Sequence, residues 1–185
     1  MRLKLLPLIY IIICGLIVGA FTHIIIVLLI PKFGANDPAT QIMQRYPVNV
    51  FRELDDVTDV KLSNVDPFMR IAICRYNLGE TGIFVKAPLS EPFWSASVFN
   101  ASGQVIYSFN QRTAIGQQLQ MLLVNPVQKA RIRQLEPETF DRIIQVEVSE
   151  AVGFVVVRTL LRDESLAKQV SDFLKALECL PHQLN

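Results

Sequence analysis

Four side chains in the middle of the chain are of types that bind small molecules: Arg75, Trp94, Tyr107 and Arg112. Guanidinium groups bind carboxylates and phosphates through paired hydrogen bonds, and aromatic rings stack on planar or sugar ligands. These residues are therefore a candidate ligand cleft, and a cleft there would make the chain a small-ligand-binding protein or an enzyme. The alternative is that Trp94 and Tyr107 are core aromatic residues on facing strands. The sequence leaves both interpretations open and identifies no ligand.

The three cysteines are Cys14, Cys74 and Cys179. We expect Cys74 and Cys179 to be either buried apolar thiols or, if their domain lies in the periplasm, a disulfide pair. A catalytic thiol at Cys74 would need a base, and His182 near the carboxyl end is the candidate.

The residue pattern gives little support for a metal site or a nucleotide-binding site. The spacing of Cys, His and acidic residues is not that of a zinc site, and the sequence lacks a glycine-rich phosphate loop. Asp55, Asp56 and Asp59 form an acidic cluster that could hold a hard cation, but their spacing is not that of a calcium loop. We therefore predict no metal site, no cofactor and no catalytic residues.

Charge is almost balanced along the chain. Of its 18 basic residues, all but Arg2 and Lys4 follow the first apolar segment, together with all 17 acidic residues. A near-neutral surface of mixed sign argues against a nucleic-acid partner and against electrostatic binding to anionic lipid.

An apolar segment, residues 5–30, precedes the part that carries these side chains, and it has no Asp, Glu, Lys or Arg. As a helix it would be about 39 Å long, enough to cross a hydrocarbon core of about 30 Å. The alternative is a cleaved signal peptide, whose apolar core usually has about 7 to 15 residues. The positive-inside rule places residues 1–4 in the cytoplasm and residues 31–185 outside it.

Gly15, Gly19, Thr22 and His23 share one face of this predicted transmembrane helix. Two small residues four apart allow a second helix to approach closely, and a histidine deep in a membrane tends to face protein. We expect a helix–helix interface there, with another membrane-anchored protein or with a second copy of the chain. The alternative is that glycine and threonine are here ordinary residues of a membrane helix.

Residues 31–185 are expected to form a single domain with a mainly β, α+β fold: a jelly-roll-like β-sandwich with flanking helices. Alternating apolar residues predict several short strands, and two of them form a hairpin around a polar turn with Gly103. The predicted strands lie within residues 68–78, 81–88, 93–110, 143–149 and 151–161. The predicted helices are residues 38–45 and a C-terminal helix, residues 164–180, capped by Asp163.

The stretch DPFMRIAICRYNL, from Asp66, and the stretch PFWSASVFNASGQVIYSFNQRTA, ending at Ala114, resemble a bacterial domain of unknown function. The membrane stretch THIIIVLLIP, from Thr22, is similar to anchored members of that family. Short members, notably in alphaproteobacteria, are membrane-anchored, and larger ones carry the domain ahead of a second uncharacterised domain. The resemblance implies a jelly-roll-type β-sandwich and a separately encoded partner with that second domain. It supplies no catalytic residues.

These observations together predict a single-pass protein of the bacterial inner membrane with a periplasmic domain. Its expected role is that of a non-catalytic interaction or accessory subunit of the cell envelope, paired with a second anchored protein.

Overall fold

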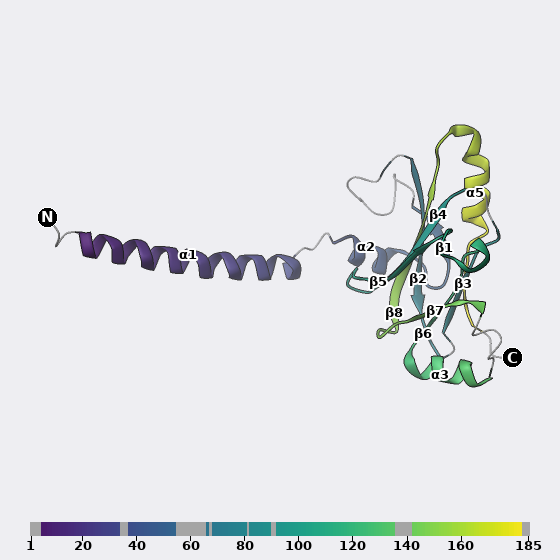
Figure 1. Ribbon diagram of the computed structural model, residues 1–185, viewed down its shortest axis with the longest axis horizontal. Coiled ribbons are helices and arrows are strands. Elements are labelled where there is room, and N and C mark those ends of the chain that lie inside the picture. Colours follow the sequence, from purple (N-terminus) through teal and green to yellow (C-terminus); the bar gives the residue numbers. More distant parts are fainter. Residues whose placement is uncertain are drawn as a thin grey trace. The chain divides into compact units, whose positions relative to one another are not determined.

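The computed structural model describes residues 5–33, 37–54, 66, 68–80, 82–89, 92–135 and 142–182. The chain divides into two compact units, Met1–Asp37 and Pro38–Asn185 (Figure 1). The predicted acidic cluster Asp55, Asp56 and Asp59 lies outside the described residues.

The first unit contains one long helix, α1 (Leu5–Phe33). Its stretch Pro7–Leu29 is long and apolar enough to cross a membrane, a property that it shares with signal sequences. Apolar side chains project all round the helix, and they are 42% to 70% exposed from Leu8 to Leu29. Pro7 lies near the start of the helix, where the missing N–H costs little.

Five strands of the second unit form an antiparallel sheet in the order β1-β2-β8-β4-β5. The most continuously apolar of the five, β8, lies at the centre, hydrogen-bonded to β2 and β4. Strands β4 and β5 form the predicted hairpin. The strands are β1 (Phe51–Glu53), β2 (Met69–Asn77), β4 (Trp94–Asn100), β5 (Val105–Asn110) and β8 (Val152–Leu160).

A second sheet of four strands has the order β7-β6-β3-β9. Its strands are β3 (Ile83–Lys86), β6 (Gln120–Val124), β7 (Ile144–Glu147) and β9 (Glu178–Pro181). The predicted α+β fold with two mainly antiparallel sheets is thus confirmed. One pair, β6–β7, is parallel, which differs from the all-antiparallel pairing of a jelly roll.

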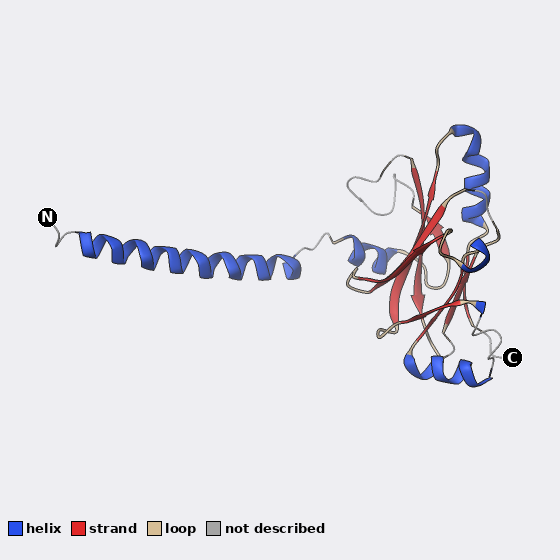
Figure 2. Ribbon diagram, in the orientation of Figure 1, coloured by secondary structure: helices blue, strands red, loops and turns tan. Residues whose placement is uncertain are grey.

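Apolar side chains form three layers around these sheets, whose strands are drawn in red in Figure 2. The main layer lies between the sheets and contains Trp94, Val155 and Met121. A second layer lies between the outer face of the five-stranded sheet and helix α2 (Pro38–Arg45). A third lies between β6 and helix α3 (Pro126–Leu135). Strand β8 is apolar on both faces because the first two layers cover it.

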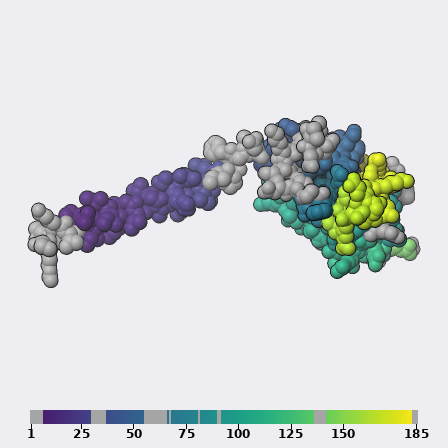
Figure 3. Space-filling model, turned by 90° about the horizontal axis from the view of Figure 1, so that it is seen from above, coloured from purple at the N-terminus to yellow at the C-terminus, as the bar shows by residue number. Residues whose placement is uncertain are grey.

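The predicted helix 164–180 is too long. A 3-10 turn, η3 (Glu164–Leu166), leads into α5 (Ala167–Lys175), and the chain then becomes extended as β9. The apolar side of α5 enters the core through Val170, Phe173 and Leu174, while its other side lies at the surface (Figure 3). The hydrogen bonds that β9 gains by pairing with β3 outweigh the helical preference of residues 178–180.

Strand β6 and helix α3 were not predicted from the sequence. The start of α3 carries a reciprocal cap: Gln128 N–H donates to Asn125 Oδ1 (2.8 Å), and Asn125 N–H donates to Gln128 Oε1 (3.0 Å). This is a capping box of the Asn-x-x-Gln form, with Pro126 in the first turn, and it is readable in the sequence.

Candidate functional site

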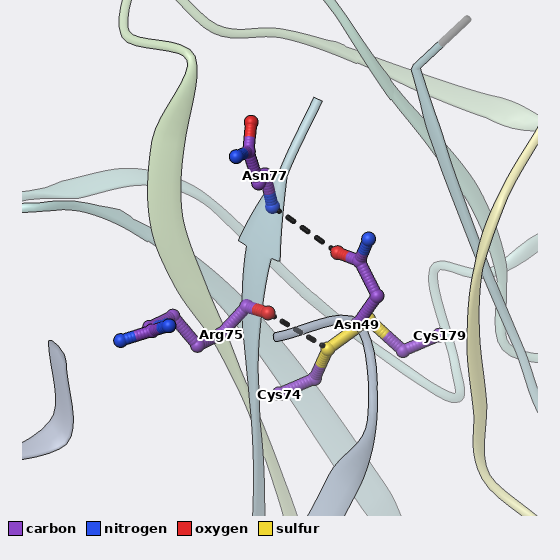
Figure 4. The surroundings of a disulfide bond; sticks show 5 residues. All are labelled: Asn49, Cys74, Arg75, Asn77 and Cys179. Carbon is purple, nitrogen blue, oxygen red and sulfur yellow. Dashed lines mark hydrogen bonds between the residues drawn. A yellow bond between two sulfur atoms is a disulfide. The ribbon is translucent and has the colours of Figure 1, made fainter. Parts of the chain in front are cut away.

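A disulfide bond joins Cys74 to Cys179 and so connects the two sheets (Figure 4). Cys74 lies on β2 opposite Val155 of β8, and Cys179 lies on β9 opposite Val85 of β3. Both cysteines are buried in the main core, and their sequence separation is 105 positions. Of the two alternatives for these cysteines, the structure has the disulfide.

The strand end beside Cys74 is held by Asn49 (Figure 4). Asn49 N–H donates to the carbonyl oxygen of Arg75 (2.7 Å), and Asn77 N–H donates to Asn49 Oδ1 (3.1 Å). Asn49 has a φ of 57°, a left-handed conformation that asparagine tolerates better than most residues. Cys74 Sγ lies 3.6 Å from the same carbonyl oxygen of Arg75. The backbone around the disulfide is therefore fixed on the β2 side.

Trp94 is a core residue and does not line a cleft. Its side chain is 0% exposed, its Nε1–H has no hydrogen-bond partner among the described residues, and its ring meets Phe109 edge to face at 5.6 Å. Tyr107, 40% exposed, lies beside Phe109 at a centroid distance of 5.8 Å. Trp94 is thus a core aromatic residue, as one alternative proposed. The aromatic residue that packs against it from the facing strand is Phe109, not Tyr107.

Arg75 lies on the opposite face of the five-stranded sheet from Trp94. Successive strand residues face opposite sides of a sheet, so Arg75 points away from the core face that Cys74 occupies. Its guanidinium donates to the carbonyl oxygen of Met43, which ties β2 to α2. Because Trp94 faces the core and Arg75 the outer face, the four predicted residues do not form one site.

Arg112 does line a pocket. The pocket has a volume of about 570 Å³ and lies where the end of β5, the following loop and the end of β8 meet. Arg112 is the one predicted cleft residue in its described lining. The other lining residues, Arg162 and Gln117 among them, were not predicted. The complete lining consists of Phe93, Asn110, Gln111, Arg112, Gln117, Leu160 and Arg162.

A closed turn after β5 positions Arg112. Asn110 Oδ1 accepts hydrogen bonds from the N–H groups of Arg112 (2.9 Å) and Thr113 (3.3 Å). Thr113 Oγ1 accepts from Asn110 N–H and donates to the Asn110 carbonyl, both at 3.1 Å. Gln111 N–H reaches back to the Trp94 carbonyl on β4 (3.1 Å). These bonds make the turn a rigid base for the Arg112 side chain.

Arg162 lines the pocket from the segment after β8. The next residue, Asp163, is acidic, but its carboxylate is hydrogen-bonded at the start of η3. Asp163 Oδ1 accepts from Ser165 N–H (2.7 Å) at the start of η3, as predicted for a cap. This hydrogen bond holds the pKa of the Asp163 carboxyl below its usual value. Among the described residues, neither Arg112 nor Arg162 has an ion-pair partner.

Two further hollows, of about 430 and 450 Å³, border α5 and share Pro88 and Ala176. One is mainly apolar. In the other, the Lys86 ammonium is already paired with Glu178 (3.0 Å). The first is lined by Asp172 and the second by Glu178, so each has a carboxylate in its lining, unlike the pocket at Arg112.

The predicted interface residues of α1 lie on a helix that is free of neighbours within its own unit. Apart from the helix's own backbone and the adjoining residues, no atom lies within 4 Å of the position that a Cβ would take at Gly15 or Gly19, so there is open space beside both glycines. Thr22 Oγ1 donates to the Val18 carbonyl (2.9 Å), so its hydrogen bond stays inside the helix. His23 is exposed on α1.

No protein-family model and no curated protein matches this chain. The chain is similar in fold, over 77% of its length, to a solved structure, the VPA0106 protein from Vibrio parahaemolyticus, with 12% identity and a TM-score of 0.57. An uncharacterised protein from Burkholderia cenocepacia matches 61% of this chain with 13% identity and a TM-score of 0.43. The matched part is 32% of the Vibrio chain and 31% of the Burkholderia chain, about a third of each. The likeness to the Vibrio protein supports the fold.

Proposed function

We propose that this chain is a single-pass protein of the bacterial inner membrane with residues 1–4 in the cytoplasm and the β domain in the periplasm. It serves there as a non-catalytic accessory subunit that pairs with a second membrane-anchored protein. The contact uses the face of α1 formed by Gly15, Gly19 and His23.

The disulfide is the observation that carries this location. Disulfides persist in the periplasm and other oxidising compartments and are rare in the cytosol. The Cys74–Cys179 bond is buried in the main core, so it belongs to the folded state of the domain. An apolar helix before an oxidised domain is the arrangement expected of a protein anchored from the cytoplasmic side.

The lack of side chains at Gly15 and Gly19, four residues apart, supports pairing within the membrane. Without side chains there, a second helix can approach the backbone closely and gain van der Waals contact. His23 adds a polar group on the same face, and such groups favour protein contact over lipid. Thr22 contributes less to this face, because its hydroxyl already donates a hydrogen bond to the Val18 carbonyl oxygen.

The β domain offers a second contact at β5, an edge strand that pairs only with β4 among the described strands. Val105 and Tyr107 of β5 are 59% and 40% exposed, and the strand has no charged residue and no proline. The other edge strands carry such protection: Arg52 and Glu53 in β1, Glu147 in β7, and Glu178 and Pro181 in β9. Charges and prolines on edge strands prevent unwanted pairing, so an unprotected edge suits a partner strand.

The first test is to identify by mass spectrometry what co-purifies with the tagged full-length protein from gently solubilised membranes. We expect a stoichiometric second membrane protein. Recovery of the chain alone as a monomer would contradict the proposal, and recovery as a homo-oligomer would replace the second protein with a second copy.

Gly19→Leu should then reduce recovery of the partner at least tenfold, because a leucine side chain would keep the backbone of the second helix from approaching closely. Ala20→Leu is the matched control, since it adds similar bulk away from that face and should leave recovery unchanged. Equal recovery with both variants would remove α1 from the interface, and Ile106→Lys on β5 would then test the edge strand.

A further inference from the structure

We infer that the pocket between Arg112 and Arg162 is an oxyanion-binding site for a ligand that carries a phosphate or carboxylate group. This inference is independent of the proposed pairing through α1. It rests on the charge of the lining, on the rigidity of the elements that present it and on the size of the pocket.

The charge of the lining is entirely positive. Arg112 and Arg162 are its charged members, and none of the described lining residues is acidic. The nearest carboxylate along the chain, Asp163, caps η3 through Ser165 and is not among the lining residues. Two guanidinium groups without carboxylate partners attract an anion, and each can bind its oxygens through two hydrogen bonds.

The backbone that carries these side chains is set before any ligand arrives. Arg112 sits on the turn closed by Asn110 and Thr113. Gln117 adopts a φ of 58°, and such left-handed conformations are costly for residues other than glycine and cluster at functional sites. Its N–H donates to the Ala114 carbonyl (3.2 Å), which holds the loop in this conformation. A fixed backbone lowers the entropy that binding would otherwise lose.

The remaining lining indicates what accompanies the anionic group. Phe93 and Leu160 supply apolar surface, and both are held by β8, since Leu160 N–H and Thr159 Oγ1 donate to the Phe93 carbonyl at 3.2 Å. A volume of about 570 Å³ lies within the range of small-molecule sites. The pocket therefore suits a small organic phosphate or carboxylate with a short apolar part.

Isothermal titration of the full-length protein in phosphatidylcholine nanodiscs tests the site, with inorganic phosphate and succinate as probes at constant ionic strength. We expect binding of at least one probe, about tenfold weaker in Arg112→Gln or Arg162→Gln and undetectable in the double variant. Arg52→Gln removes an exposed arginine from β1 and should bind like the wild type. Arg112→Lys keeps the charge but loses the paired hydrogen bonds, so its affinity should be intermediate. Unchanged melting temperatures without probe will show that the variants fold.

The anionic group has two possible sources, a soluble molecule or a lipid headgroup, and a second arm separates them. Melting temperatures are compared in phosphatidylcholine and phosphatidylglycerol nanodiscs. Stabilisation by phosphatidylglycerol that Arg112→Gln/Arg162→Gln abolishes and Arg52→Gln retains would identify a lipid headgroup. Probe binding in phosphatidylcholine discs without that lipid effect would identify a soluble anion.

Two results would overturn the inference. One is the absence of both probe binding up to 10 mM and lipid stabilisation. The other is binding or stabilisation that persists in the double variant. Loss of the co-purifying partner in Gly19→Leu bears on neither result, so the pairing and the anion site fail or stand separately.

Discussion

Strand β8 and helix α1 are both almost continuously apolar, but the protein treats them in opposite ways. In β8, Val155 is completely buried against the second sheet, and Phe154 and Val156 are buried beneath α2. In α1, Val18 is 65% exposed, and no described residue of its unit covers it. The apolar surface of β8 is removed from water by its own domain, whereas that of α1 requires another environment.

The comparison shows that apolar composition alone does not say what covers a segment. The lengths of the two segments differ: the nine residues of β8 form one strand of a sheet, whereas the twenty-nine helical residues of α1 are long enough to cross a membrane. Cysteine, glycine, valine and tyrosine are among the residue types that occur both in the core around β8 and in α1, so paired substitutions of these four separate the two environments. Each pair below is measured as equilibrium unfolding of the β domain in the full-length protein.

The largest difference is expected for cysteine. Cys74→Ala/Cys179→Ala should destabilise the β domain by about 4 kcal/mol, because the disulfide closes a long loop in the unfolded chain. Cys14 in α1 is a free thiol, so Cys14→Ala should leave unfolding unchanged. Equal stability of the double variant under oxidising conditions would show that the bond does not constrain the fold.

Glycine should give the next largest difference. A Cβ at Gly153 in β8 would overlap the carbonyl oxygen of Phe99 and the hydroxyl oxygen of Tyr76. Since β4 cannot move without breaking the sheet, we expect Gly153→Ala to cost about 3 kcal/mol. Gly15→Ala meets nothing within 4 Å and should cost the domain nothing. A neutral Gly153→Ala would mean that β8 and β4 are less tightly packed than described.

Valine should differ by a smaller amount. Val155→Ala removes two buried methyl groups between the sheets and should cost about 2 kcal/mol. Val18→Ala in α1 should not change the unfolding of the domain, because Val18 lies in the other unit. If both variants unfolded at the same denaturant concentration, the contrast between buried β8 and uncovered α1 would be lost.

Tyrosine should give the smallest difference at neutral pH and a distinctive one in alkali. Burial, with a smaller effect of Glu150, raises the pKa of Tyr76, whose hydroxyl donates to the Phe99 carbonyl (3.2 Å). Tyr76→Phe should cost about 1 kcal/mol at pH 7 through loss of this hydrogen bond.

The same raised pKa makes wild-type stability depend on pH above the ordinary tyrosine pKa of about 10. The unfolded chain then loses the Tyr76 proton while the folded chain keeps it, so the unfolding free energy falls by up to about 1.4 kcal/mol per pH unit. Tyr76→Phe should reduce this slope between pH 10 and 11, whereas Tyr10→Phe in α1 should retain it. An unaltered slope in Tyr76→Phe would show that Tyr76 ionises as easily folded as unfolded.

Local patterns were sufficient for much of the fold. The uncharged run of α1, the alternation in β2, β4 and β5, and the apolar run of β8 each predicted the right element. The C-terminal helix failed at residues 178–180, because β3 offers that segment a strand partner that its own sequence does not reveal. Helix α3 was missed although Asn125 and Gln128 form a capping box, since its pattern of apolar residues is weak.

At the candidate site, what the sequence determined and what the tertiary structure decided can be separated residue by residue. The sequence by itself determined that Arg112 is a cation near the end of a hairpin and that α1 is long enough to cross a membrane. For Cys74 and Cys179 it left two alternatives, buried thiols or a disulfide. Only the tertiary structure placed Arg162 beside Arg112, buried Trp94, turned Arg75 to the outer face and brought Cys179 to Cys74. These outcomes depend on strand order and on which residues of two distant segments share a face. Hydrogen bonds between strands that lie far apart in the sequence set both, so no local pattern contains them.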